Sequence, residues 1–179
     1  MNIKLKLAVI IPLIALVASV GVLGVSSAQS NEMNQEHMEK IRKNCLQSKN
    51  SLSQLHRSDA LLRVNRGQLY ESISTKLMSR FNSRVSSAGH NSSNLSTITR
   101  DYAQELDQFR EDYIAYEEQL SSAESINCTK QPVAFYDAVV GAHEKRQTVR
   151  DTVAGLNQML DDYRRELLRF ETSLLKEDN

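Results

Sequence analysis

The feature that most constrains the fold is a heptad repeat over residues 135–174. Two rows of positions, each spaced by seven, are apolar or aromatic everywhere except at Arg146. The first row is Phe135, Ala142, Val149, Leu156, Tyr163 and Phe170, and the second is Val139, Arg146, Val153, Leu160, Leu167 and Leu174. This repeat predicts a narrow apolar seam along one side of an α-helix. A single helix cannot bury such a seam, so another helix must lie along it.

Two more long helices are predicted upstream, so the fold class is all-α. The predicted helices are helix A (31–85), helix B (97–125) and helix C (132–177). The segment 86–96, rich in Ser, Asn and Gly, predicts a loop, with Asn94 or Ser96 as the N-cap of helix B. A second break at 126–131 precedes Pro132, which suits a first helical turn. Short connections predict an elongated up-down-up three-helix bundle with coiled-coil-like packing.

The N-terminal segment predicts a membrane-spanning or signal helix. Lys4 and Lys6 precede an uncharged apolar run, residues 7–25, which is long enough to cross a bilayer. Cleavage after Ala28 would make it a signal peptide and the protein secreted, but the run exceeds an ordinary signal core, so a retained signal-anchor is favoured. The lysines predict a cytoplasmic N-terminus. In both cases residues 29–179 form the extracytoplasmic helical bundle.

The charge balance argues against nucleic acid as a partner. The chain has 22 Lys and Arg and 22 Asp and Glu. Residues 1–28 contribute Lys4 and Lys6 and no acid, so the rest is slightly acidic. Phosphate binding requires a basic surface.

Two cysteines test the predicted layout. Cys45 and Cys128 belong to an extracytoplasmic chain, where a disulfide is the default. Their midpoint lies in the predicted loop between helices A and B, so folding there brings them together at the membrane-proximal end. Two free buried thiols are the alternative, and a catalytic pair lacks the CxxC spacing.

Polar residues that interrupt the apolar sides predict two buried ion pairs. Asp59 and Arg146 lie at equal heights above the base of the bundle, and Arg66 lies level with Asp107. We therefore expect the pairs Asp59–Arg146 and Arg66–Asp107, which would fix the helix register. A polar binding site inside the bundle is the alternative.

Charge complementarity between helices A and B explains a run of basic residues. Helix A is rich in Lys and Arg, whereas residues 101–128 carry many acids and a single Arg. Packing against helix B accounts more simply than an anionic ligand does for the run Arg57, Arg63, Arg66, Lys76, Arg80 and Arg84.

No motif for catalysis is found. The sequence from His143 to Gln147 approaches the zinc-binding HExxH pattern, but Gln147 replaces the second His. GxSxG, phosphate-loop and EF-hand patterns are absent from the sequence. The sequence therefore predicts no enzyme and assigns no catalytic, cofactor or metal residue.

Three stretches carry a resemblance to known proteins. Asp59–Gly67, Tyr70–Met78 and Lys130–Asp137 resemble uncharacterised membrane-anchored or secreted helical proteins of candidate-phylum bacteria of the Saccharibacteria type. The resemblance covers roughly residues 40–175. It implies a bacterial surface location and no known activity.

Three functions remain open. The favoured one is an interaction or scaffold protein of the cell envelope that presents its distal tip, Arg84–Arg100, to an envelope protein. The second is a ligand-sensing or accessory subunit of an envelope transport or signalling complex, although residues 29–179 lack the second apolar helix of sensor bundles. The third is a periplasmic-type holdase chaperone. The seam is long enough for a further helix from a second copy, so a homo-oligomer is compatible with it.

Overall fold

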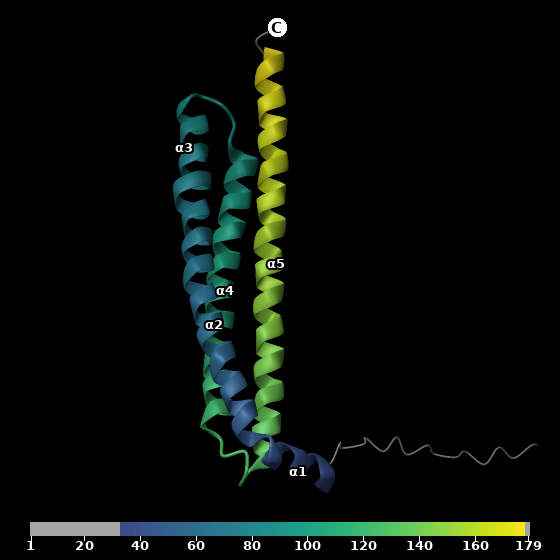
Figure 1. The fold of residues 1–179 in the computed structure, drawn as a ribbon. Helices are drawn as coiled ribbons and strands as arrows, with labels where there is room; N and C mark the ends of the chain where they lie inside the picture. Colours follow the sequence, from purple (N-terminus) through teal and green to yellow (C-terminus); the bar gives the residue numbers. More distant parts are fainter. Residues whose placement is uncertain (1–32, 178–179) are drawn as a thin grey trace, which may run out of the picture. The chain divides into compact units, whose positions relative to one another are not determined.

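The computed structural model describes residues 33–177, which are helical and contain no strand. The helices are α1 (Gln35–Lys43), α2 (Cys45–Ser72), the π-helix η1 (Ile73–Met78), α3 (Ser79–Ser87), α4 (Ser93–Ser125) and α5 (Pro132–Glu177) (Figure 1). The predicted anchor, residues 7–25, lies outside the described residues. Across residues 33–177, no helix combines the length and the apolar character needed to cross a membrane.

The segment predicted as helix A is divided rather than continuous. α1 ends at Lys43, and Asn44 separates it from α2. The Asn44 side chain donates a hydrogen bond to the carbonyl of Lys40 at 2.9 Å. Asn favours such local bonds over helix continuation, which accounts for the break at this residue. Cys45 therefore begins a new helix.

A π-helical turn interrupts the same segment further along. The backbone N–H of Ser79 donates to the carbonyl of Ser74, and the Ser79 hydroxyl bonds that carbonyl as well, at 2.8 Å. A backbone hydrogen bond between residues five apart adds about one residue to the helical turn that it closes. Buried Tyr70, Ser74, Met78 and Asn82 follow one another at intervals of four. The wider turn keeps these four side chains on one face.

The turn between α3 and α4 is shorter than predicted. Gly89 has a φ of 85°, and the N–H of His90 donates to the carbonyl of Val85 at 3.1 Å, which closes α3 as glycine-ended helices do. α4 begins at Ser93, where the Asn91 side chain accepts the backbone N–H of Ser93. The predicted capping residues, Asn94 and Ser96, lie inside the helix instead.

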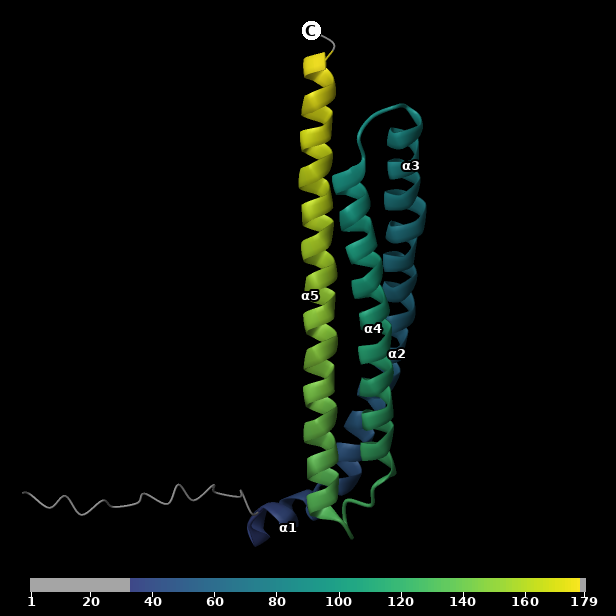
Figure 2. The same ribbon diagram turned by 180° about the vertical axis from the view of Figure 1, so that it is seen from behind.

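α4 is the central element of the packing. Its buried residues recur every three or four positions: Leu95, Tyr102, Leu106, Phe109, Tyr113, Tyr116, Leu120 and Ala123. α4 packs along α5, and α2, η1 and α3 also pack against α4. Among the described residues, the backbones of α2, η1 and α3 approach α4 closely but not α5. Figure 2, the view from behind, again shows α4 between α5 and the α2–α3 segment.

The two seam rows of α5 are buried to different degrees. Phe135, Ala142, Leu156 and Tyr163 of the first row are buried. The second row, which includes Arg146, is only partly buried. Most of the first row therefore lies in the core, with Val149 and Phe170 partly buried, while the whole second row keeps some contact with solvent.

Candidate functional site

The structure joins the two cysteines in a disulfide. Cys45 and Cys128 have Cα atoms 5.5 Å apart and are 83 positions apart in sequence. The bond connects the first residue of α2 to the turn between α4 and α5. Close by, the Arg42 side chain donates to the carbonyl of Thr129 at 3.3 Å. The junction of α1 and α2 is thus tied to the turn between α4 and α5 by both covalent and polar contacts.

Asp59 and Arg146 also come together. The guanidinium of Arg146 donates two hydrogen bonds to the Asp59 carboxylate, at 2.7 and 3.0 Å. The Tyr116 hydroxyl donates a third, at 2.8 Å. The Asp59 residue is 7% exposed. One side chain from each of α2, α4 and α5 therefore meets in a satisfied buried cluster.

The hydrogen bonds of the cluster stabilise the protonation states of its three side chains. Burial raises the pKa of Asp59, but the hydrogen bonds from Arg146 and Tyr116 and the charge of Arg146 outweigh burial, so the pKa lies below its ordinary value. The bond to Asp59 raises the pKa of Arg146. Burial, followed by the bond to Asp59, raises the pKa of Tyr116. The carboxylate is charged and Tyr116 protonated at neutral pH.

The second expected pair does not form. Asp107 forms an ion pair with Arg110 on its own helix, and Arg110 also pairs with Glu71 of α2. Arg66 has no ion pair with any of the residues 33–177. Both Arg66 and Asp107 are exposed. Equal height along the helices therefore does not bring these two side chains into contact, and Arg66 lines a cavity between α2, α4 and α5 instead.

Other polar contacts join α2 to α4. The His56 ring nitrogen lies 2.8 Å from a Glu124 carboxylate oxygen. Arg63 lies 3.5 Å from Glu117 and places its guanidinium carbon 4.8 Å from the centre of the Tyr113 ring. Basic α2 and acidic α4 therefore make the kind of contact that their composition predicts, although the individual partners differ.

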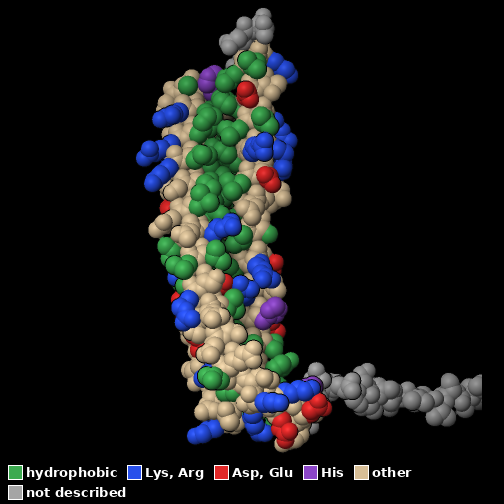
Figure 3. Space-filling view, in the orientation of Figure 1, with side chains coloured by type: hydrophobic (Ala, Val, Ile, Leu, Met, Phe, Trp, Pro, Cys, Tyr) green, Lys and Arg blue, Asp and Glu red, His purple; other side chains and the backbone are tan. Residues whose placement is uncertain are grey.

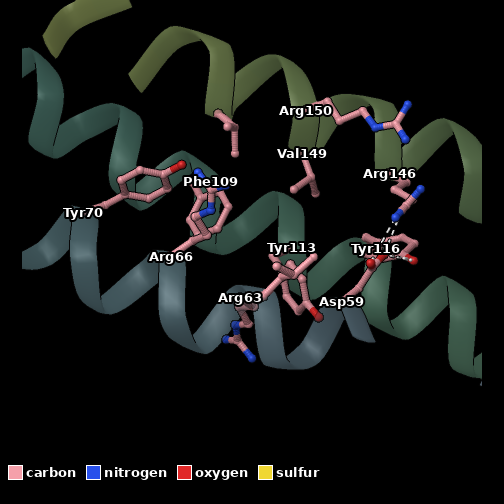
Figure 4. A pocket seen from close by; sticks show the side chains of 12 residues that line it. Asp59, Arg63, Arg66, Tyr70, Phe109, Tyr113, Tyr116, Arg146, Val149 and Arg150 are labelled. Carbon is pink, nitrogen blue, oxygen red and sulfur yellow. Dashed lines mark hydrogen bonds and ion pairs between the residues drawn. The ribbon is translucent and has the colours of Figure 1, made fainter. Parts of the chain in front are cut away.

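A cavity opens beside the Asp59 cluster. It has a volume of about 260 Å³, is lined by α2, α4 and α5 and is open to solvent (Figure 4). Its lining residues are Asp59, Leu62, Arg63, Arg66, Tyr70, Phe109, Tyr113, Tyr116, Arg146, Val149, Arg150 and Val153. The lining therefore combines apolar side chains with four arginines and one aspartate.

The aromatic wall of the cavity contains unsatisfied hydroxyls. Tyr70 and Phe109 meet edge to face, with ring centres 5.7 Å apart, and Tyr113 and Tyr116 do so at 5.9 Å. The hydroxyl oxygens of Tyr70 and Tyr113 are buried and have no hydrogen-bond partner. In Figure 4 the Tyr70 hydroxyl points toward the part of the cavity near Phe109 and Arg66. Buried hydroxyls normally have partners, so these two require an explanation.

An apolar stripe continues from the cavity along the molecule. On α2 and η1 it contains Leu62, Leu69 and Leu77, which are each more than half exposed. On α5 it contains the partly buried Val153, Leu160 and Leu167 of the second seam row. Figure 3 shows hydrophobic side chains gathered in a line between the α2–α3 segment and α5, with Lys and Arg along both edges. We call these six residues the apolar stripe.

The cavity was not predicted as a specific site. From the sequence we identified Asp59, Arg66 and Arg146 as polar interruptions of the apolar helix sides. We interpreted them as members of structural ion pairs. The available signal was that Arg66 and Arg146 both stand at otherwise apolar positions of their helices. In the described part of the chain, no group of three His, Cys, Asp or Glu could hold a metal ion. The geometry of the cavity is suited to binding a small ligand.

Comparison of the chain with protein-family models, with curated proteins and with solved structures finds no match.

Proposed function

We propose that this chain is a membrane-anchored, extracytoplasmic interaction and scaffold protein of the bacterial cell envelope, without a catalytic step of its own. Residues 7–25 would anchor it, with the N-terminus in the cytoplasm and an up-down-up three-helix bundle outside. The observation that supports the proposal is the apolar stripe, since Leu62, Leu69 and Leu77 are 52%, 51% and 54% exposed. Contiguous exposed apolar residues with polar edges are typical of protein-binding surfaces.

The partner that best fits the stripe is an acidic amphipathic helix of an envelope protein. Leu62, Leu69 and Leu77 recur at helical spacing, so a helix lying along them would bury an apolar face of matching period. Lys76, Arg80 and Arg84, spaced by four, are exposed beside the stripe. A partner with Asp and Glu next to its apolar face would meet these cations. The basic residues disfavour the same stripe of a second copy, which would repel them.

Site-specific photo-crosslinking tests this surface. A photoreactive phenylalanine analogue is placed at Leu69, in the stripe, or at Ile114, which is 46% exposed on α4. After irradiation of cells of the source bacterium, crosslinked peptides are identified by mass spectrometry. We expect one envelope protein to be captured from Leu69 and not from Ile114, through a peptide that is acidic and amphipathic.

The other outcomes would contradict the proposed partner. Capture of many unrelated secreted chains from Leu69 would indicate a holdase chaperone. Crosslinks between two copies of this chain alone would indicate a self-assembling structural protein. Equal capture from Leu69 and Ile114 would show that the stripe has no special role.

The cavity favours a second candidate function, a ligand-binding accessory subunit of an envelope complex. The volume of about 260 Å³ is close to the lower end of ordinary ligand pockets. Such a role is compatible with a scaffold, because the cavity and the far part of the stripe involve different residues.

A further inference from the structure

We propose that the cavity between α2, α4 and α5 binds a small organic anion with an apolar body, such as a medium-chain carboxylate or alkyl phosphate. This goes beyond the scaffold function and does not depend on it. The ligand would place its anionic head by Arg66 and Tyr70 and its apolar part against Leu62, Phe109 and Val153. All five of these residues line the cavity.

The charge of the lining selects an anion. The Asp59 carboxylate is already neutralised by Arg146, with hydrogen bonds of 2.7 and 3.0 Å, and capped by Tyr116. Arg66 has no ion pair among residues 33–177, whereas Arg150 donates a hydrogen bond to the side-chain oxygen of Gln147 at 3.3 Å and extends toward Arg146 (Figure 4). The guanidinium group of Arg66 thus lines the cavity without a carboxylate of its own. Guanidinium groups bind carboxylates and phosphates through paired hydrogen bonds.

The hydroxyl of Tyr70 supplies a second reason for a polar ligand atom. Tyr70 is 2% exposed, and its oxygen is buried without a partner. The hydroxyl points toward the part of the cavity where Arg66 lies (Figure 4). An acceptor atom of a bound anion placed there would satisfy the hydroxyl and the guanidinium together. Leaving a buried hydroxyl unbonded is otherwise unfavourable.

The remaining lining selects an apolar body of limited size. Val149 and Val153 of α5 face Phe109 and Tyr113 of α4 across the space, with Leu62 at its edge. A cavity of about 260 Å³ accommodates a short alkyl chain or a single ring system rather than a long lipid. Since Leu62 and Val153 also belong to the apolar stripe, the ligand has a route from solvent along the stripe.

Isothermal titration of the full chain in lipid nanodiscs with sodium octanoate, below its micelle concentration, tests the proposal. Empty nanodiscs provide the blank for partition into lipid. The test variants are Arg66→Gln with Tyr70→Phe, and Val153→Trp, which fills the cavity. The matched control is Arg57→Gln with Tyr136→Phe, an exposed arginine of α2 and an exposed tyrosine of α5 that do not line the cavity. Thermal unfolding by circular dichroism verifies that each variant is folded.

We expect saturable 1:1 binding by the unmodified chain and by the control. Binding should weaken at least about tenfold in the double cavity variant, because charge-assisted hydrogen bonds are lost. It should also be lost in a folded Val153→Trp variant. Octyl phosphate in place of octanoate identifies the preferred head group, and 1-octanol and octylammonium should bind more weakly than either anion. Heat equal to that of empty nanodiscs, undiminished binding by the double cavity variant, or equal affinity for 1-octanol would overturn the proposal.

Discussion

Asp59 is the residue on which the polar interior depends. Its carboxylate accepts hydrogen bonds from Arg146 and Tyr116, so it links α2 to both α4 and α5. A buried carboxylate is stable only while its partners remain, because water is no longer available to solvate the charge. Removal of the charge leaves Arg146, a partly buried cation, without its counter-ion.

The first prediction concerns Asp59→Asn. We expect the free energy of unfolding to fall by about 3 kcal/mol, since breaking one side of a buried pair leaves the other uncompensated. Asp107→Asn is the matched control, because Asp107 is exposed and pairs with Arg110 of its own helix. That variant should change stability by less than about 0.5 kcal/mol. Urea unfolding followed by circular dichroism at 222 nm measures both, and an unchanged midpoint for Asp59→Asn would refute the role given to this pair.

The same variant has a predictable pH dependence. The pKa of Asp59 is lower in the folded chain than its ordinary value of 3.8, so the unfolded state binds the proton more readily. The stabilisation is therefore complete above about pH 4 and is lost as the pH falls through the folded-state pKa. Repeating the urea series between pH 6 and pH 2 should show a steeper acid loss for the unmodified chain than for Asp59→Asn. Parallel curves would contradict this linkage.

At the scale of single residues, the sequence predicts how far along the helix axis a residue lies better than it predicts which way the side chain points. Counting along the helices places Asp59 level with Arg146, and the structure brings them into contact. The same reasoning places Arg66 level with Asp107, yet Asp107 pairs with Arg110. Position along a helix follows from the rise per residue, whereas direction depends on accumulated rotation. An error of one or two residues in alignment changes which face a side chain occupies. The cavity required knowledge of direction and so could not be predicted.

Among the elements, η1 explains how the α2–α3 segment keeps its inner face. Tyr70 and Met78 are eight residues apart, which in a regular α-helix would place them about 80° apart around the axis. The π-helical turn reduces this angle, and both residues are buried at 2% and 0% exposure. Such turns behave as single-residue insertions into a helix.

The second prediction follows from treating η1 as a one-residue insertion into the α2–α3 helix. Deletion of Lys76, an exposed residue of η1, should leave Tyr70 and Met78 seven residues apart, about 20° from alignment on a regular helix. We expect the melting temperature to change by a few degrees at most. Deletion of the exposed Leu61 in regular α2 is the matched control, and it should reduce stability by several kcal/mol, because it rotates the following residues about 100° out of contact with α4. An equal loss of stability in the two deletion variants would contradict the interpretation of η1 as a one-residue insertion.

At the scale of elements, regular helices were predictable and their interruptions were not. α4 and α5 end near their predicted limits because Gly, Asn and Pro occur where periodicity stops. The break at Asn44 and the wide turn at η1 arise inside a segment that has no Gly or Pro at either point. Both interruptions serve tertiary contacts: the disulfide at Cys45 and the packing of Met78 on α4. A periodicity analysis cannot detect a requirement set by a distant partner.

For the whole molecule, the disulfide provides the main covalent constraint, and the third prediction concerns it. Replacing both Cys45 and Cys128 by Ser should lower the free energy of unfolding by about 4 kcal/mol, since the bond closes a loop over 83 positions. Calorimetry of the unmodified chain with and without a reductant provides the control, and the reduced chain should melt with the double variant. If reduction leaves the melting temperature unchanged, the disulfide does not contribute to stability in this way.

If the chain is anchored as we propose, the disulfide also determines how it responds to a pulling force. If Met33 and Glu177 were pulled apart, tension would pass from α1 through Cys45 directly to Cys128 and then along α5. α2, η1, α3 and α4 would carry no load through their backbone, because the covalent bridge bypasses them. Reduction would place these helices in the load path and release roughly 280 Å of additional extension from the 83-position loop. The α2 and α4 walls of the cavity belong to the bypassed segment, whereas its α5 wall lies in the load path. A pull that unravels α5 would therefore open the cavity from one side while α2 and α4 stay joined through the disulfide.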